Sequence, residues 1–117
     1  MKLQDDFFRI ISMHAGSREL RFRILLNAEH PIYAAHFPGN PVMPGVCMIQ
    51  MVKELVELYL RKELFLRQVI SAKFLNVINP LKYKEVDFSM IFEDDEKVSV
   101  IVKDEDVTFA RMSLRFD

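Results

Sequence analysis

One long helix, apolar around almost its whole circumference, constrains this chain more than any other feature. It is expected over Met43–Lys62, because Pro44 is tolerated in a first helical turn, where no N–H donor is needed. Its polar residues form one narrow stripe at helical spacing: Gln50, Lys53, Glu54, Glu57 and Arg61. Nearly every other position from Val46 to Leu60 is apolar. Such a helix is stable only if other elements of the chain enclose it.

The remaining segments show the pattern of strands that are half buried. Apolar side chains occupy alternate positions in Arg18–Asn27 and in Glu85–Phe92. Further strands are expected at Phe7–His14, Phe65–Val77, Lys97–Lys103 and Asp106–Phe116. One buried helix against about six antiparallel strands is an α+β layer. We therefore expect a single domain over residues 1–117, with the sheet wrapped around the helix.

Composition narrows the classes of function. The formal net charge of −1 provides no basic excess to neutralise phosphates, which argues against a nucleic-acid-binding protein. A single cysteine excludes an internal disulfide framework and a multi-cysteine zinc site. The longest uncharged run, Ala34–Val52, is interrupted by prolines and glycines and is not expected to span a membrane. We expect a cytoplasmic protein, and a homodimer, because a chain this short leaves much surface exposed.

The loop before the helix concentrates the residues that break regular structure. The segment Ala35–Val46 holds three prolines and two of the three glycines in the chain. A rigid glycine-containing loop at a helix N-terminus brings backbone N–H groups close to a ligand, where the helix dipole favours negative charge. A histidine there, His36, is a candidate general base near neutral pH. Composition alone leaves open a well-packed turn with an incidental histidine.

The run His-Phe-Pro-Gly-Asn-Pro-Val-Met-Pro-Gly-Val, from His36 to Val46, resembles the signature of the β-hydroxyacyl-[acyl-carrier-protein] dehydratases of the FabZ type. A weaker resemblance runs from Ala72 to Pro80, where that family has a similar strand with a Phe and then a Pro. The family usually continues Pro-Gly-Asp, whereas this chain has Pro80-Leu81-Lys82. The resemblance implies the hot-dog fold, a long helix wrapped by an antiparallel sheet, which agrees with the arrangement expected from the periodicity.

The resemblance also implies a reaction. A (3R)-hydroxyacyl thioester on acyl-carrier protein loses water to give an enoyl thioester, and no metal or organic cofactor takes part. By this resemblance His36 removes the C2 proton, and backbone N–H groups near Gly45 and Val46 polarise the thioester carbonyl. A Glu on the central helix, from the other subunit of a dimer, handles the departing hydroxyl. Phe37, Gly39 and Met43 are the further candidates for substrate binding, although Phe37 and Met43 could equally be plain core.

The second catalytic group departs from the family pattern. The family Glu lies fourteen positions after the histidine, and that position holds Gln50 here. A Gln amide forms hydrogen bonds with a hydroxyl or a water, but it does not donate a proton as an acid at neutral pH. Glu54 lies one helical turn further on, where the family commonly has Gln. We expect Glu54 to belong to the solvated stripe; the alternative is that it replaces the family Glu, through a water or through Gln50.

Three functions remain open on this basis. The first is a carrier-protein dehydratase with His36 as base and Gln50 or Glu54 in the second role. The second is an impaired subunit that binds acyl-carrier protein or complements a partner subunit in a heteromer, which Gln50 favours. The third is thioester hydrolysis, which requires a carboxylate to activate water and so also depends on Glu54. Cys47 is expected to pack in the core rather than to act as a nucleophile.

Overall fold

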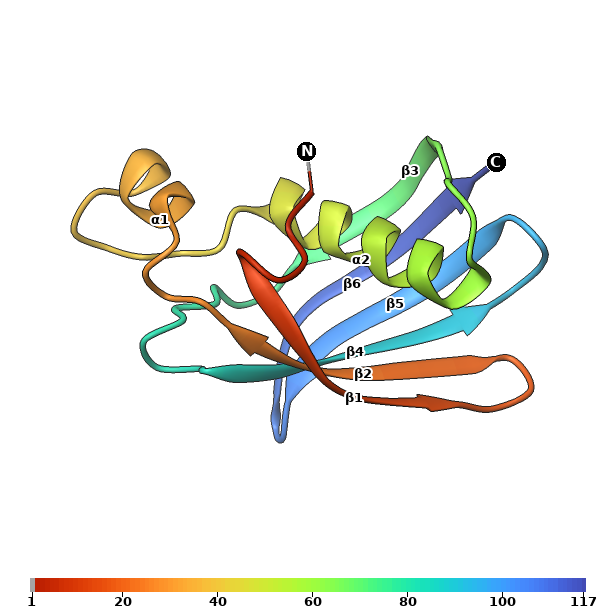
Figure 1. Cartoon of the computed structure of the whole chain (residues 1–117), viewed down its shortest axis with the longest axis horizontal. Helices are drawn as coiled ribbons and strands as arrows, with labels where there is room; N and C mark the ends of the chain where they lie inside the picture. Colours follow the sequence, from red (N-terminus) through yellow and green to blue (C-terminus); the bar gives the residue numbers. More distant parts are fainter. Residues whose placement is uncertain (1) are drawn as a thin grey trace.

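The computed structural model describes residues 2–117 and shows two helices against one curved antiparallel sheet (Figure 1). The elements in chain order are β1 (Phe8–Ala15), β2 (Glu19–Leu26), α1 (Pro31–His36), α2 (Gly45–Leu60), β3 (Leu66–Phe74), β4 (Glu85–Phe92), β5 (Lys97–Asp104) and β6 (Val107–Phe116). The sheet order is β1-β2-β4-β5-β6-β3, so β1 and β3 are its edges. All neighbouring strands pair antiparallel.

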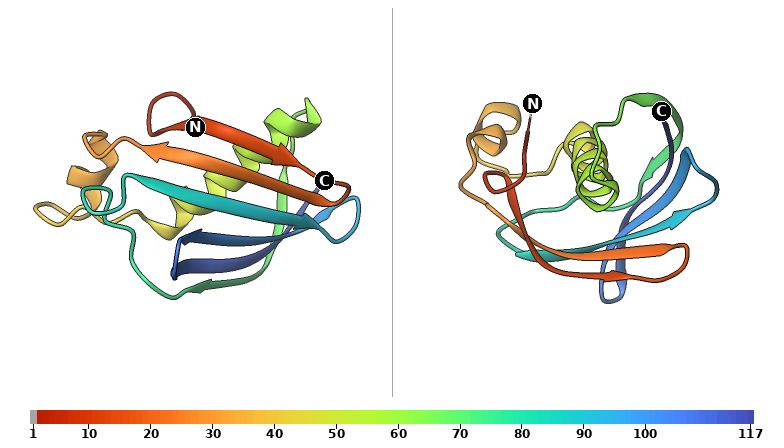
Figure 2. Two further views of the ribbon diagram at one scale, coloured as in Figure 1. Left: turned by 90° about the horizontal axis from the view of Figure 1, so that it is seen from below. Right: turned by 45° about the vertical axis from the view of Figure 1, so that its right-hand side comes forward.

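The long helix α2 lies across the hollow side of the sheet, and the two further views show the sheet curving around it (Figure 2). The alternation in β2 produces this arrangement, because Leu20, Phe22 and Ile24 are completely buried while the residues between them face outward. Side chains of α2, including Met51 and Leu55, join the same hydrophobic core. The α+β architecture expected from the sequence is confirmed.

The helix boundaries differ from the expected ones at both ends. α2 begins at Gly45, after Pro44 in extended conformation, and not at Met43. It ends at Leu60, because Arg61 adopts the left-handed conformation (φ 57°) and donates its N–H to the carbonyl of Glu57. The strand β3 is also shorter than expected and ends at Phe74. Both helix ends are set by non-helical backbone conformations, at Pro44 and at Arg61. Hydrophobic periodicity does not reveal such conformations.

The short helix α1 was not expected from the sequence, which indicated only a loop between β2 and α2. Pro31 occupies its first turn, where the missing N–H has no consequence. His30 caps the helix, since its Nδ1 accepts a hydrogen bond from the backbone N–H of Ile32 at 3.1 Å. His36 is the last residue of α1, so this helix fixes where the candidate base stands.

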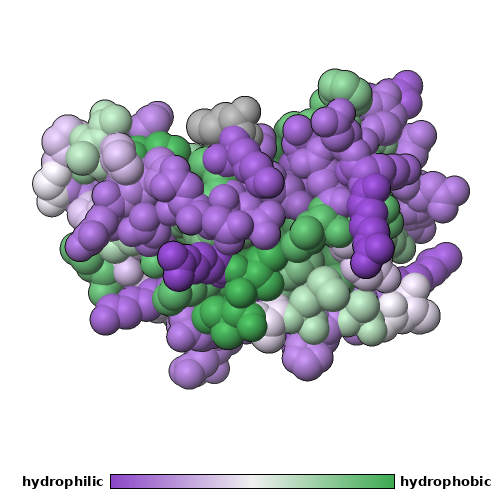
Figure 3. All heavy atoms as spheres, in the orientation of Figure 1, coloured by the Kyte–Doolittle hydropathy of each residue, from purple (hydrophilic) through white to green (hydrophobic). Residues whose placement is uncertain are grey.

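Apolar side chains remain exposed on both edges of the sheet. On β1, Ile11 and Met13 are about half exposed, and Figure 3 shows apolar side chains gathered on the face where β1 runs. On β3 the exposed apolar residues include Val69 and Phe74. Within residues 2–117, neither helix is long and apolar enough to cross a membrane.

Candidate active site

His36 stands at the end of α1 with its side chain exposed. Its Nδ1 lies 3.1 Å from the carbonyl oxygen of Ile32. A carbonyl only accepts hydrogen bonds, so in the neutral imidazole Nδ1 carries the proton and Nε2 carries the lone pair. The helix therefore presents His36 as a base at Nε2, accessible to a molecule outside this chain.

The loop after His36 contains two positions that favour glycine. Gly39 has φ +77°, a left-handed conformation in which a side chain would be strained, and it is exposed. Gly45, the first residue of α2, needs to be glycine for another reason: a Cβ there would lie 2.6 Å from the ring of Phe74. The ring of Phe74, half exposed on β3, thus covers the start of α2, where the first N–H groups have no partner inside the helix.

Gln50 and Glu54 form the other half of the site, on one face of α2. The amide Nε2 of Gln50 donates to Glu54 Oε2 at 2.9 Å. The backbone N–H of Leu3 donates to both carboxylate oxygens, at 2.9 Å to Oε1 and 2.7 Å to Oε2. The backbone N–H of Gln4 donates to Oε1 at 2.7 Å. Glu54 is thus a charged group surrounded by hydrogen-bond donors.

The expectation that Glu54 belongs to the solvated stripe is wrong. Its side chain is only 6% exposed, and it is the one buried charged residue in the described part of the chain. The reason is that residues 3 and 4 lie over it and saturate its oxygens. The same contacts oppose the alternative role through a water, because both carboxylate oxygens already accept hydrogen bonds from protein donors.

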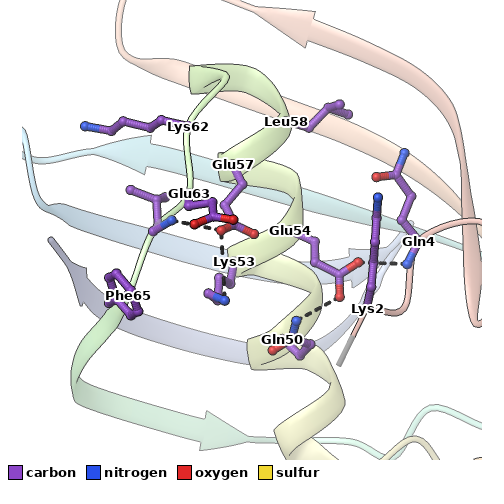
Figure 4. Close-up of a pocket in the computed structure, with 11 residues that line it drawn as sticks. Lys2, Gln4, Gln50, Lys53, Glu54, Glu57, Leu58, Lys62, Glu63 and Phe65 are labelled. Carbon is purple, nitrogen blue, oxygen red and sulfur yellow. Dashed lines mark hydrogen bonds and ion pairs between the residues drawn. The ribbon is translucent and has the colours of Figure 1, made fainter.

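A pocket of about 610 Å³ opens beside this pair (Figure 4). It is lined by Lys2, Gln4, Gln50, Lys53, Glu54, Glu57, Leu58, Lys62, Glu63, Leu64 and Phe65. In Figure 4 the side chains of Gln50 and Glu54 point toward each other at its wall. His36 is not among these lining residues, and Figure 1 shows α1 set apart from the body of α2. One chain therefore does not bring the three candidate catalytic residues into one pocket.

The remaining candidates divide between core and surface. Met43 is buried at 3% exposure, its N–H bonded to the carbonyl of Ile78, and so it belongs to the core. Phe37 and Val46 are 44% and 67% exposed. Cys47 is buried, and burial raises the pKa of its thiol, which keeps it in the unreactive neutral form. In the part of the chain that is described, no cluster of three or more His, Cys, Asp or Glu residues could hold a metal ion.

Sequence reasoning missed three contributors to this region: Phe74, Leu3 and Gln4. Phe74 lies in a segment whose resemblance to the family was noted, so its place in the chain could have identified it. Leu3 and Gln4 contribute backbone N–H groups, for which no side-chain pattern exists. Tyr33 is buried at 2% exposure, and its hydroxyl has no hydrogen-bond partner among the described residues.

Comparison with known protein sequences identifies dehydratases as relatives of this chain. The model of the ApeI-like family, described as ApeI dehydratase, matches residues 12–113. The 3-hydroxyacyl-[acyl-carrier-protein] dehydratase FabZ of Lactobacillus helveticus is 32% identical over 102 residues, which cover 80% of this chain and 68% of that protein. FabZ of Rickettsia massiliae is also 32% identical, over 63 residues. That match covers 47% of this chain and 43% of the Rickettsia protein, so it spans less than half of that relative.

Solved structures share the fold at low sequence identity. A chain of the dehydratase heterocomplex ApeI:P from Xenorhabdus doucetiae superposes with a TM-score of 0.79 at 16% identity, covering 92% of this chain and 95% of that one. A protein from Erwinia carotovora subsp. atroseptica superposes with a TM-score of 0.67, also at 16% identity, covering 92% and 91%. The hot-dog fold expected from the motif is thereby confirmed.

Proposed function

Because the chain belongs to the ApeI-like, FabZ-related family of dehydratases, we propose that it dehydrates a (3R)-hydroxyacyl thioester carried on acyl-carrier protein. The product is a trans-2-enoyl thioester for fatty-acid or lipid synthesis in the cytoplasm. The observation that carries the proposal is the geometry of His36, whose Nδ1 is engaged by the carbonyl of Ile32 while Nε2 remains available as base. No metal or organic cofactor is required, because the thioester already acidifies C2.

In the proposed reaction His36 Nε2 takes the proton from C2 of the substrate. The electron pair moves toward the thioester oxygen, where the N–H groups of Gly45 and Val46 at the start of α2 stabilise the developing charge. The electron pair of the enolate then forms the C2–C3 double bond as the C3–O bond breaks and its electrons leave with the oxygen. The departing hydroxyl takes up a proton and leaves as water. Gln50 orients this hydroxyl through a hydrogen bond, while the proton returns from the imidazolium of His36.

The proposal places the working site between two subunits. His36 lies outside the pocket beside Gln50 in one chain, so a second copy has to bring the two together. Exposed apolar residues lie around the start of α2 and along β3: Phe37, Val46, Phe65, Val69, Ile70, Phe74, Leu75 and Val77. Burial of this surface in a homodimer would supply the hydrophobic stabilisation that a second subunit requires.

The carrier protein is the expected macromolecular partner. Carrier proteins of this class are strongly acidic, and a nearly neutral chain needs a local basic surface to meet one. The candidates are Arg67, Lys73, Lys82 and Lys84. Arg67 and Lys73 lie on β3, and Lys82 and Lys84 lie on the segment between β3 and β4.

A second candidate function is a subunit that works only with a different partner subunit. Gln50 favours it, because an amide whose Nε2 is engaged by Glu54 is no source of a proton for the leaving hydroxyl. The ApeI:P structure, which shares this fold, is described as a dehydratase heterocomplex, and this supports the alternative. Thioester hydrolysis is disfavoured, since both oxygens of Glu54 are already occupied by donors and do not activate a water.

The test is enoyl-thioester formation from a short (3R)-hydroxyacyl thioester by the purified protein and by its His36→Ala variant. We expect turnover to fall roughly 10²–10⁴-fold in the variant, which is the usual contribution of a positioned acid–base group. His14→Ala is the matched control, because His14 is also exposed but lies on β1. Equal turnover in His36→Ala and in the control would refute the assignment. No turnover in any of the three proteins would favour the heteromeric alternative.

A further inference from the structure

The chain before β1 forms a compact structure that the reaction does not use. Residues 2–7, which we call the N-terminal bracket, fold back on themselves: the carbonyl of Leu3 accepts from the N–H groups of Asp6 at 3.2 Å and Phe7 at 2.7 Å. Asp5 adopts a left-handed conformation at φ 69° to make this turn. Leu3 and Phe7 are buried at 1% and 0% exposure. These anchors make the bracket a rigid unit rather than a loose terminus.

One end of the bracket is fixed to α2. Oε1 of Glu54 accepts from the N–H groups of Leu3 and Gln4, and Oε2 accepts from the N–H of Leu3 and from the amide of Gln50. These are charge-assisted hydrogen bonds in a buried place, where each is stronger than its equivalent in water. The position of Gln50 is therefore linked to that of the bracket through one side chain.

The other end of the bracket is fixed to α1. The carboxylate of Asp6 lies 3.1 Å from Nε2 of His30, whose Nδ1 accepts from the N–H of Ile32 and caps the helix. The ring of Phe7 stacks on Tyr33 at 5.2 Å and meets the ring of His30 edge-on at 5.2 Å. Since α1 ends at His36, these contacts set the direction in which the base is presented.

We propose that the N-terminal bracket couples the two halves of the site, so that Asp6 and Glu54 act as positioning residues for His36 and Gln50. In the right-hand view of Figure 2 the bracket, in red, runs between α1 and α2. The inference rests on the proposed function only for its catalytic consequence. The mechanical link itself follows from hydrogen bonds at both ends of one rigid segment.

Amide hydrogen exchange tests the link without any need for turnover. The N–H groups of Tyr33 and Phe37 bond to the carbonyls of His30 and Tyr33, so they report the opening of α1. The measured quantity is the ratio of their exchange rate in a variant to that in the wild type, and the β5 amides are followed separately to report any loss of global stability. We expect this ratio to rise about fivefold in Asp6→Ala and also in Glu54→Gln, although Glu54 lies on the other helix.

The matched control is Glu57→Gln. Glu57 is also on α2, and its carboxylate also accepts from a backbone N–H, that of Leu64 at 2.8 Å. Within residues 2–117 its hydrogen bond and ion pair are to Leu64 and Lys53, and neither belongs to the bracket. Its exchange ratio should stay at the wild-type value. An exchange ratio in Glu54→Gln no higher than in Glu57→Gln would overturn the coupling. If Glu54→Gln does not fold, the exchange ratio of Asp6→Ala tests the coupling by itself.

The catalytic consequence is tested on the active protein. Asp6→Ala should lower kcat about tenfold with KM nearly unchanged, because the base is misdirected while substrate contacts persist. Asp6→Asn should restore most of kcat, since its side-chain oxygen still accepts from His30. A change confined to KM, or no rescue by Asn, would contradict a positioning role. A protein without turnover would refute the proposed function and leave the exchange ratio to decide the coupling.

Discussion

The two halves of the site are built in opposite ways. His36 ends a six-residue helix, is exposed, and has one hydrogen bond, to a carbonyl in its own turn. Gln50 is on a sixteen-residue helix and donates to Glu54, which is buried and accepts from two further N–H groups. A base that must meet an incoming thioester needs an accessible nitrogen, whereas a residue that only orients a hydroxyl needs a fixed position. The exposure of His36 and the fixed position of Gln50 therefore match the role proposed for each residue.

The difference also separates stability from activity. Changes at His36 should affect turnover and leave the fold intact, because few contacts are lost there. Changes at Glu54 should affect the fold first, because buried donors depend on its carboxylate.

Glu54→Ala is expected to have the largest effect on stability. The substitution leaves the N–H groups of Leu3 and Gln4 and the amide of Gln50 without their acceptor, and should lower the free energy of unfolding by about 3 kcal/mol, or roughly a hundredfold in the folding equilibrium. Urea unfolding measures this value.

The control for this prediction is Glu57→Ala, which removes one acceptor of a backbone N–H and should lower stability by about 1 kcal/mol. His36→Ala should change stability by less than about 0.5 kcal/mol. Equal losses in the Glu54 and His36 variants would contradict the contrast between the two halves.

Gln50→Glu tests the same contrast by its effect on turnover. A carboxylate here would lie within hydrogen-bond distance of Glu54, since the present amide nitrogen is 2.9 Å from Oε2. Two carboxylates this close do not both ionise readily, so the pair retains one proton and gains an acid beside the leaving hydroxyl. We expect kcat to rise about tenfold at pH 6, and the gain to disappear as pH rises and the pair loses its proton.

Gln4→Glu is the control, because Gln4 lines the same pocket and the substitution adds the same charge without a role in the reaction. If Gln50→Glu and Gln4→Glu have the same turnover, the amide at position 50 does not limit the reaction.

The sequence predicted the enclosed helix and the strands well, since both depend on side-chain periodicity within one element. The burial of Leu20, Phe22 and Ile24 is an example. It failed where distant segments meet. Glu54 looked solvated because it lies on the polar stripe of its own helix, while the backbone donors that bury it come from residues 3 and 4. The short helix α1 was missed because six residues show too little periodicity, and its cap is a histidine rather than a usual capping residue.

Tyr33→Phe is expected to have a small effect, and it is a gain in stability. The hydroxyl of Tyr33 is buried on the helix that bears His36 and has no partner among the described residues, so its removal should stabilise the protein by about 1 kcal/mol. The stack on Phe7 would be retained, because the aromatic ring is unchanged. Tyr59→Phe is the control, since Tyr59 is 39% exposed and its hydroxyl loses little on folding.

The same variant also tests how stability changes at alkaline pH. Burial, with a smaller contribution from Cys47, raises the pKa of the Tyr33 hydroxyl above its unfolded value of about 10. A raised pKa stabilises the folded state fully below pH 10, and this contribution is lost as pH rises toward the folded pKa, because the unfolded chain releases the proton first. Wild type should therefore lose more stability than Tyr33→Phe between pH 9 and pH 11 in urea unfolding. Parallel loss in the two proteins would mean that the hydroxyl is not buried in solution, and that α1 is held less firmly against the core than its contacts with Phe7 indicate.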